Sequence, residues 1–199
     1  MNPQDYKVII LVVTAVSALI VASPALQRLL VYPQTEFFTE LCLLGPGHMA
    51  ESIPYNITRG DSYNVFLGVS NHLGNCTYYS LQVKFRNLNQ SGPDSFNRTS
   101  SSLAPLYSVN VFVADKETWE LPVTFSFDYS YDSNSSTVNF NSLTFNGEAL
   151  DLKGYSTTWD SNKSVFFGNL VFELWIYNEA TDGFQYHERY VDLKLNLLV

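Results

Sequence analysis

The chain has 199 residues, of which 15% are charged and 15% aromatic, and its formal net charge is −8 with a pI of about 4.7. This acidic balance excludes a nucleic-acid-binding surface and a polybasic patch for anionic lipid headgroups. Many Tyr and Phe residues and few charges favour strands over helices with charged outer faces. We therefore expect a single, mainly β domain whose partners do not include nucleic acid.

An apolar segment lies near the N-terminus. Residues 8–27, between Lys7 and Arg28, carry no charge. As a helix they reach about 30 Å, the thickness of the hydrocarbon core of a bilayer. We expect a single-pass transmembrane helix in the cell membrane, with the lipid bilayer as one partner. A cleaved signal peptide is the alternative, because Ala22 begins a run of small residues.

This segment divides the chain into three parts: a short cytoplasmic tail over residues 1–7, a transmembrane helix over 8–31 and an extracytoplasmic domain over 32–199. The flanking charges do not set the orientation, because Asp5 opposes Lys7 and Arg28 follows the segment. The helix carries small residues at a spacing that lines one face and lets another helix approach. They are Ala15, Ala18, Ala22 and Ala25. They predict packing against other membrane or surface subunits, and a plain lipid-facing anchor is the alternative.

Six N-x-S/T sequons, none with proline in the middle, follow the apolar segment and give the orientation. Their asparagines are Asn56, Asn75, Asn89, Asn97, Asn134 and Asn162. Because glycosyltransferases act outside the cytoplasm, the sequons favour an extracytoplasmic domain with covalent N-glycans and a cytoplasmic N-terminus.

Beyond residue 33 the hydrophobic pattern has a period of two, which is typical of strands with one buried face. The clearest strands cover residues 77–86 and 119–129, and others are expected at 36–44, 63–69, 107–113, 138–145, 165–177 and 184–197. Turn residues such as Asn146-Gly147 separate them, and no helical periodicity intervenes. The pattern predicts an all-β, antiparallel sandwich of about eight strands, immunoglobulin-like or jelly-roll, with a closed barrel as the alternative.

Two segments of this domain carry specific expectations. The loop over residues 87–104 is polar and holds two sequons, so we expect it to be an exposed excursion. The last strand ends the chain with Val191, Leu193, Leu195 and Leu197 on one face. Because this strand is strongly apolar, we expect it to be docked, either inside its own domain or on the sheet edge of a neighbouring subunit.

Three phrases at the start of the β domain carry a family resemblance. They read YPQTEFFTELCLLGPGHMAE over residues 32–51, PYNITRG over 54–60 and VFLGVSNHLG over 65–74. They resemble the archaeal domain of unknown function 1616 family, whose members carry several membrane helices followed by an outer β domain. The resemblance covers residues 32–85 and implies archaeal origin, membrane attachment and a β fold, but no mechanism. This sequence departs from the family by its single apolar helix.

The two cysteines, Cys42 and Cys76, are open to two interpretations. Outside the cytoplasm they can form a disulfide, which contributes about 3 kcal/mol by closing a loop of this length. As free residues, both also fit small buried positions.

Catalytic motifs are absent from the sequence. It contains no Gly-x-Ser-x-Gly elbow, no Cys-x-x-Cys pair and no phosphate-binding glycine loop. The acidic residues Glu117, Glu120 and Asp128 fall at outward or strand-end positions. His48, Glu51 and His72 lie on turns without metal-ligand spacing. We therefore expect no enzyme, no catalytic residues, no metal site and no cofactor.

Three functional hypotheses follow. The first is a non-enzymatic envelope protein that acts as an interaction, structural or accessory subunit of a membrane or surface assembly. The second is a pilin-like filament subunit with an apolar helix and a glycosylated β domain. The third is a glycan-binding or glycan-processing domain with Trp159 and Trp175 as stacking residues.

Overall fold

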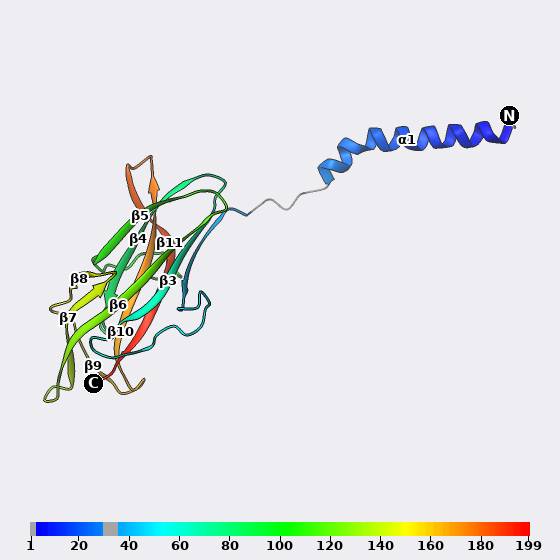
Figure 1. Ribbon diagram of the computed structural model, residues 1–199. Helices are drawn as coiled ribbons and strands as arrows, with labels where there is room; N and C mark the ends of the chain where they lie inside the picture. The colour runs from blue at the N-terminus through cyan, green and yellow to red at the C-terminus, as the bar shows by residue number, and fades with distance from the viewer. Residues whose placement is uncertain (1–2, 30–35) are drawn as a thin grey trace. The chain divides into compact units, whose positions relative to one another are not determined.

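The computed structural model describes residues 3–29 and 36–199, with side chains described for residues 6–21 and 36–199. Contacts divide the chain into two units, Met1–Glu36 and Phe37–Val199. The first unit holds helix α1 (Pro3–Leu29), and the second is the β domain (Figure 1). Residues 30 and 31 of the expected membrane helix lie outside the described residues. Within the described part of the chain, no helix has both the length and the apolar character required to cross a membrane.

The β domain is built from strands and turns, and the described residues after α1 form eleven strands. They are β1 (Phe38–Leu44), β2 (Asn56–Ile57), β3 (Tyr63–His72), β4 (Thr77–Arg86), β5 (Tyr107–Val113), β6 (Thr118–Asp132), β7 (Thr137–Phe145), β8 (Glu148–Asp151), β9 (Ser156–Asp160), β10 (Val165–Asn178) and β11 (Gly183–Leu197).

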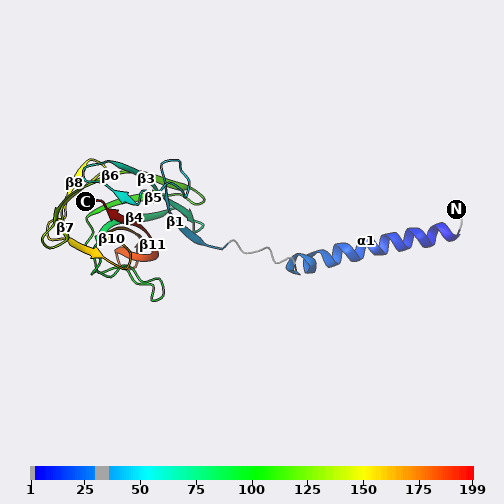
Figure 2. The ribbon, with the colours of Figure 1, turned by 90° about the horizontal axis from the view of Figure 1, so that it is seen from below.

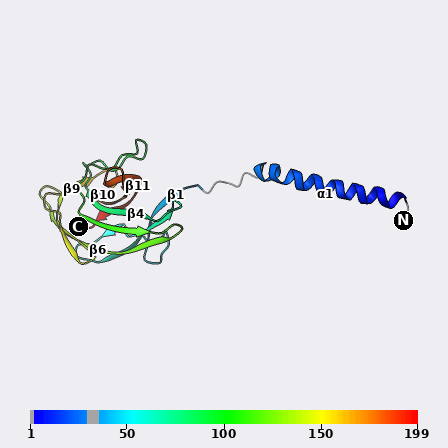
Figure 3. The same ribbon diagram turned by 90° about the horizontal axis from the view of Figure 1, so that it is seen from above.

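These strands pair into one sheet that curls back on itself. One run has the order β1-β3-β6-β7, with β8 on the side of β7, and the other has the order β5-β4-β10-β11-β2. Strand β9 joins the two runs, because it pairs with β7 at one end and with β10 at the other. Seen along the strands, the two runs curve around a central space (Figure 2 and Figure 3).

Side chains from both runs fill that space. Alternate residues of each strand point inward, as the period-two pattern requires. Phe85 of β4 is fully buried, and its ring centroid lies 5.8 Å from that of Phe127, 4.7 Å from that of Phe140 and 5.4 Å from that of Tyr155. These aromatic contacts connect β4 of one run with β6 and β7 of the other, so they hold the curled sheet closed around its core.

All eight strands expected from the sequence are present, and the expected turn at Asn146-Gly147 joins β7 to β8 with positive φ angles of 48° and 85°. The strand number, the sandwich of two stacked sheets and the purely antiparallel pairing were wrong, because all eleven strands belong to one curled, mixed sheet. Strands β2, β8 and β9 have two to five residues, too few for an alternating pattern to show. Strand β2 also pairs in parallel with β11.

The last strand docks inside its own domain, as one of the two alternatives predicted. Strand β11 pairs with β10 along most of its length, and Leu193, Leu195 and Leu197 are at most 2% exposed. Strand exchange with another subunit is therefore not needed to bury this strand.

Candidate functional site

An aromatic cluster lies on the outer face of the run β5-β4-β10-β11. The inward positions of β4 fill the core, so the intervening Tyr78 faces outward. Strand pairing then places aromatic residues of three strands around it. The ring of Tyr78 stacks on Phe112 of β5 at 4.2 Å and lies 5.1 Å from Phe184 of β11, while Phe184 lies 5.6 Å from Tyr177 of β10. These residues come from parts of the chain about 100 residues apart, and only the sheet brings them together.

A hollow runs along this cluster, with a cavity volume of about 680 Å³, which is within the usual range of small-molecule sites. We call it the aromatic groove. Its lining consists of Leu73, Asn75, Cys76, Thr77, Tyr78, Phe112, Ile176, Tyr177 and Glu179. The Tyr177 hydroxyl donates to Asp182 Oδ1 at 2.5 Å, and this hydrogen bond raises the pKa of Tyr177. The groove thus combines apolar ring faces with a few polar groups, the composition of a binding site.

A buried ion pair lies on the same outer face. Lys84 Nζ donates to Glu173 Oε2 at 2.7 Å, and the two side chains are only 3% and 0% exposed. Ser101 donates to Glu173 Oε1 through its backbone N–H at 2.9 Å and through its hydroxyl at 2.5 Å. Trp175 Nε1 donates to Glu173 Oε2 at 3.3 Å, and the Lys84 ammonium lies 5.5 Å from the centre of the Trp175 ring. The carboxylate of Glu173 is therefore bound by four donor groups.

Glu173 of this ion pair fixes the end of the loop between β4 and β5 on the sheet, because it accepts both hydrogen bonds of Ser101. Ser101 and Leu103 of the loop are buried, and residues 165–174 of β10 are buried on both faces. The expectation of a wholly exposed excursion over residues 87–104 was thus wrong for its last part. In the sequence, Leu103 follows three serines and begins a short apolar stretch that ends at Leu106, which is too short for a periodic pattern to indicate burial.

A second polar network links the first strand to the rest of the domain. The Tyr79 hydroxyl donates to Asn71 Oδ1 at 3.2 Å, so it accepts from the Thr39 hydroxyl at 3.0 Å. Thr39 Oγ1 then accepts from His187 Nε2 at 3.0 Å, because its own proton is already used. Burial raises the pKa of Tyr79, and burial together with nearby Arg189 lowers the pKa of His187. The network requires a proton on Nε2 of His187, and the lowered pKa favours the neutral imidazole.

All six sequon asparagines are exposed. Asn56 lies on β2, and the other five lie in the connections between strands. These are the β3–β4 turn for Asn75, the β4–β5 loop for Asn89 and Asn97, the β6–β7 turn for Asn134 and the β9–β10 turn for Asn162. Burial of the asparagine therefore prevents glycosylation at none of the six sequons.

Both cysteines are free thiols, so the disulfide alternative was wrong. Cys42 pairs with Gly68, four residues before the end of β3 at His72, whereas Cys76 follows the turn beyond that end. Four residues of strand cover roughly 13 Å, more than a disulfide spans. Cys42 is half-buried, and burial raises the pKa of its thiol, while Cys76 is exposed in the aromatic groove.

The histidines are separated from one another. His48 Nδ1 lies 3.1 Å from Glu120 Oε2, His72 stacks on Phe38, and His187 belongs to the Thr39 network. Among the described residues, no three His, Cys, Asp or Glu side chains are grouped as metal ligands would be. The residues His48, Glu51 and His72 therefore do not form a site together.

The two tryptophans of the glycan hypothesis differ in their surroundings. Trp159 is 47% exposed and packs edge-on against Phe166. Trp175 is partly buried and hydrogen-bonded to Glu173. Trp175 thus supports the buried ion pair, and the open aromatic surface is formed by Tyr78 and Phe112, which the sequence did not single out.

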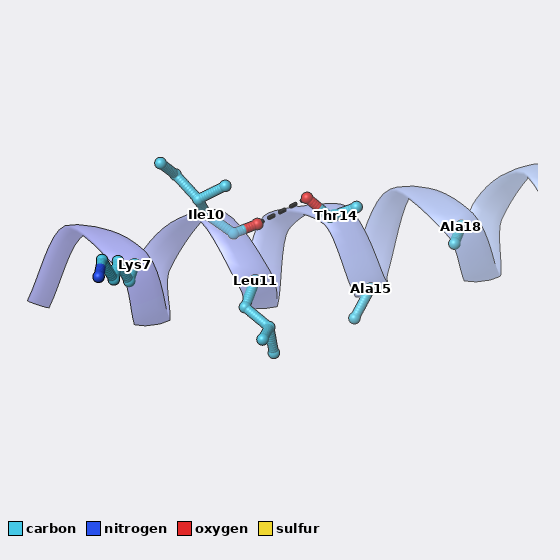
Figure 4. A pocket seen from close by; sticks show the side chains of 6 residues that line it. All are labelled: Lys7, Ile10, Leu11, Thr14, Ala15 and Ala18. Carbon is cyan, nitrogen blue, oxygen red and sulfur yellow. Dashed lines mark hydrogen bonds between the residues drawn. The ribbon is translucent and has the colours of Figure 1, made fainter. Parts of the chain in front are cut away.

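Helix α1 presents apolar side chains to its surroundings on all sides. Every described side chain from Val8 to Val21 is exposed, with values between 48% and 80% for the large apolar ones. Ala15 and Ala18 share a shallow hollow with Lys7, Ile10, Leu11 and Thr14, and the Thr14 hydroxyl donates to the Ile10 carbonyl at 2.7 Å (Figure 4). Ala22 and Ala25 of the predicted packing face lie outside the described side chains.

Comparison with known proteins places the β domain in a family. The family model described as "Domain of unknown function (DUF1616)" matches residues 33–163. No curated protein matches the chain.

Several solved structures share a distant likeness. A β-glucosidase from Listeria innocua in complex with gluconolactone is 10% identical with a TM-score of 0.34, over 83% of this chain and 17% of that one. The CARDB domain of the PF1109 protein from Pyrococcus furiosus, in complex with di-metal ions, is 8% identical with a TM-score of 0.38, over 82% and 94%. The b-glucosidase EmGH1 from Erythrobacter marinus is 13% identical with a TM-score of 0.37, over 80% and 16%. Scores this low support no inference about function.

Proposed function

The chain belongs to the DUF1616 family of domains of unknown function, and we propose that it is a non-enzymatic, membrane-anchored and N-glycosylated protein of the cell envelope. Helix α1 is its anchor and its contact with other subunits. The β domain faces the exterior as an interaction or accessory module. The archaeal origin implied by the family resemblance stays a prediction.

The observation that carries this proposal is the exposure of α1. Its apolar side chains surround the helix, so no single face can bury them against a domain of the same chain. A helix that is apolar on every side is stable when it is buried in lipid or among other helices. The uncharged stretch of the sequence runs on to residue 27, beyond the side chains that the structure describes.

The six exposed sequons support the exterior position of the β domain. Covalent glycans are bulky and hydrophilic, and they are accommodated where the asparagine lies at the surface. Five of the six lie in connections between strands, which also tolerate such additions without disturbing sheet pairing.

The test compares the full-length chain with a variant whose α1 carries Val12→Asp and Val16→Asp. Each carboxylate placed in a bilayer costs about 2.5–3.5 kcal/mol, so we expect the variant to leave the membrane fraction while the native chain needs detergent for release. Phe96→Asp is the control, because Phe96 is 93% exposed on the β4–β5 loop, and it should stay with the membrane. A native chain that is released without detergent would contradict the anchor.

A second pair of variants tests the contact with other subunits. Ala15→Ile and Ala18→Ile fill the hollow on one face of α1, so we expect less partner protein to co-purify in mild detergent at unchanged membrane retention. Val13→Ile, which enlarges an apolar side chain outside this hollow, is the control. If all three variants recovered as much partner protein as the native chain does, α1 would be a plain anchor without a packing face.

The pilin-like alternative draws on the same exposed helix, because helices of filament subunits also bury apolar surface against copies of themselves. Electron micrographs of detergent-free preparations separate the two: filaments would replace discrete particles.

A further inference from the structure

One sequon lies at the edge of the aromatic groove. Asn75 is among the residues that line the groove, and none of the other five sequon asparagines is. Two hydrogen bonds fix the turn that holds it: Asn71 Nδ2 donates to the Asn75 carbonyl at 2.7 Å, and the Gly74 N–H donates to Asp115 Oδ1 at 2.8 Å. Gly74 itself has a φ of 81°, a conformation that favours glycine. The position of Asn75 relative to the groove is therefore well defined.

The side chain of Asn75 is available for modification. It is exposed, and its Oδ1 accepts a hydrogen bond from the Thr77 hydroxyl at 3.4 Å. Within the described part of the chain, no hydrogen bond engages Asn75 Nδ2, the atom to which a glycan is attached. Glycosylation joins the anomeric carbon of the first sugar to this nitrogen, with loss of one amide proton and departure of the lipid phosphate of the oligosaccharide donor.

The groove offers a surface that suits a sugar ring. One face of a pyranose is formed by C–H groups, which pack against the electron-rich faces of aromatic rings. Phe112 is 69% exposed and stacks on Tyr78, so the pair presents a flat aromatic surface beside Asn75. The Glu179 carboxylate also lines the groove and can accept hydrogen bonds from sugar hydroxyls.

We propose that the glycan on Asn75 folds back into the aromatic groove and that its first sugars pack against Phe112 and Tyr78. The chain thereby covers an aromatic patch with its own carbohydrate, and this glycan is part of the domain's structure. The other five glycans extend into solvent. The inference depends on the N-glycosylation in the proposed function and adds a specific role for one of the six sites.

The test is a double-mutant cycle in the full-length glycoprotein, with Asn75→Gln removing the glycan and Phe112→Ala removing the stacking surface. A stacking contact of ordinary strength shifts the melting temperature of a domain of this size by about 2–4 °C. We expect Asn75→Gln to lose this amount and Phe112→Ala to lose more, because Phe112→Ala also removes the stacking on Tyr78. The double variant should lose no more than Phe112→Ala alone, because the contact with the glycan is then already gone. Asn134→Gln combined with Phe112→Ala is the matched control, and its two effects should add.

Two further measurements keep the outcomes apart. Thr77→Ser retains the Asn75 sequon, so it should keep both the glycan and the native coupling to Phe112. Glycopeptide mass spectrometry gives the occupancy of each site. Additive losses at Asn75 and Phe112 with the site occupied, or a bare Asn75 beside occupied sequons, would overturn this inference alone. Six bare asparagines in native material would overturn it together with the glycosylation in the proposed function.

Discussion

Replacing Lys84 by Met tests how the β4–β5 loop is fixed to the domain. The substitution keeps most of the unbranched side chain and removes its charge, together with the long hydrogen bond from Lys84 Nζ to Ser101 Oγ at 3.4 Å. Glu173 is then left as a buried carboxylate without its cationic partner. Breaking a buried pair in this way costs about 3–5 kcal/mol, because the remaining charge is uncompensated. The three donors from Ser101 and Trp175 stay in place, so the loop itself should remain on the sheet.

The reverse substitution, Glu173→Leu, should have a different signature. It removes the acceptor of both Ser101 hydrogen bonds, so the end of the loop loses its attachment as well as the ion pair. We expect fast amide exchange over residues 99–104 in Glu173→Leu and near-native exchange there in Lys84→Met. The double variant should be less destabilised than the sum of the two, because no charge is left unpaired.

Urea denaturation followed by tryptophan fluorescence measures these free energies, and hydrogen exchange measures the loop. Lys194→Met is the control, because Lys194 is 65% exposed and its Nζ lies 3.9 Å from Asp192 Oδ2. A surface pair of this kind contributes little. If Lys84→Met were as stable as Lys194→Met, the buried ion pair would not contribute to the stability of the domain. If Glu173→Leu left the loop's exchange unchanged, the hydrogen bonds from Ser101 to Glu173 would not be what fixes this loop.

Three other predictions concern the core, the last strand and pH. Phe85→Ala should lower the free energy of unfolding by about 3–5 kcal/mol in the same urea experiment, because it empties a fully buried position, whereas an unchanged midpoint would contradict the packing described. Deletion of residues 192–199 removes three buried leucines of β11 and should abolish folding, and a folded truncation seen by circular dichroism would point to another docking site for this strand. Between pH 7 and pH 5 the melting temperature should fall less steeply in His187→Gln than in the native chain. The pKa of His187 is lowered below 6.5 on folding, so the unfolded chain takes up the proton first and acid favours unfolding. The aspartates with lowered pKa, Asp94, Asp128 and Asp132, titrate below 3.8 and outside this window, so equal slopes would show that His187 is not responsible.

The sequence predicted the fold where alternation extends over seven or more residues. Strand β6 is an example, because Val123, Phe125, Phe127 and Tyr129 all point inward as expected. It could not predict the parallel contact of β2 with β11, since two residues carry no periodicity. The sequence left the disulfide and the free cysteines open as alternatives, because the strand register that separates Cys42 from Cys76 is not encoded locally.

The candidate site was less visible in the sequence than the fold. Tyr78 and Phe112 become neighbours through the pairing of β4 with β5, which no local pattern encodes. Glu173 did leave a signal, because it is the one charged residue in the apolar stretch 165–177, and a buried carboxylate needs partners. Its partners Lys84 and Ser101 lie 89 and 72 residues away, so the sequence could indicate a buried charge but not the loop that it fixes.

Labelling of lysines on intact cells with a membrane-impermeant amine reagent tests the central claim most directly. Lys153 and Lys163 are exposed on the β domain, Lys7 precedes the apolar stretch, and the buried Lys84 serves as an internal control. We expect modification of Lys153 and Lys163 on intact cells, modification of Lys7 only after the membrane is opened, and no modification of Lys84 in the folded protein. Modification of Lys7 on intact cells with Lys153 and Lys163 protected would place the β domain inside the cell and contradict the account.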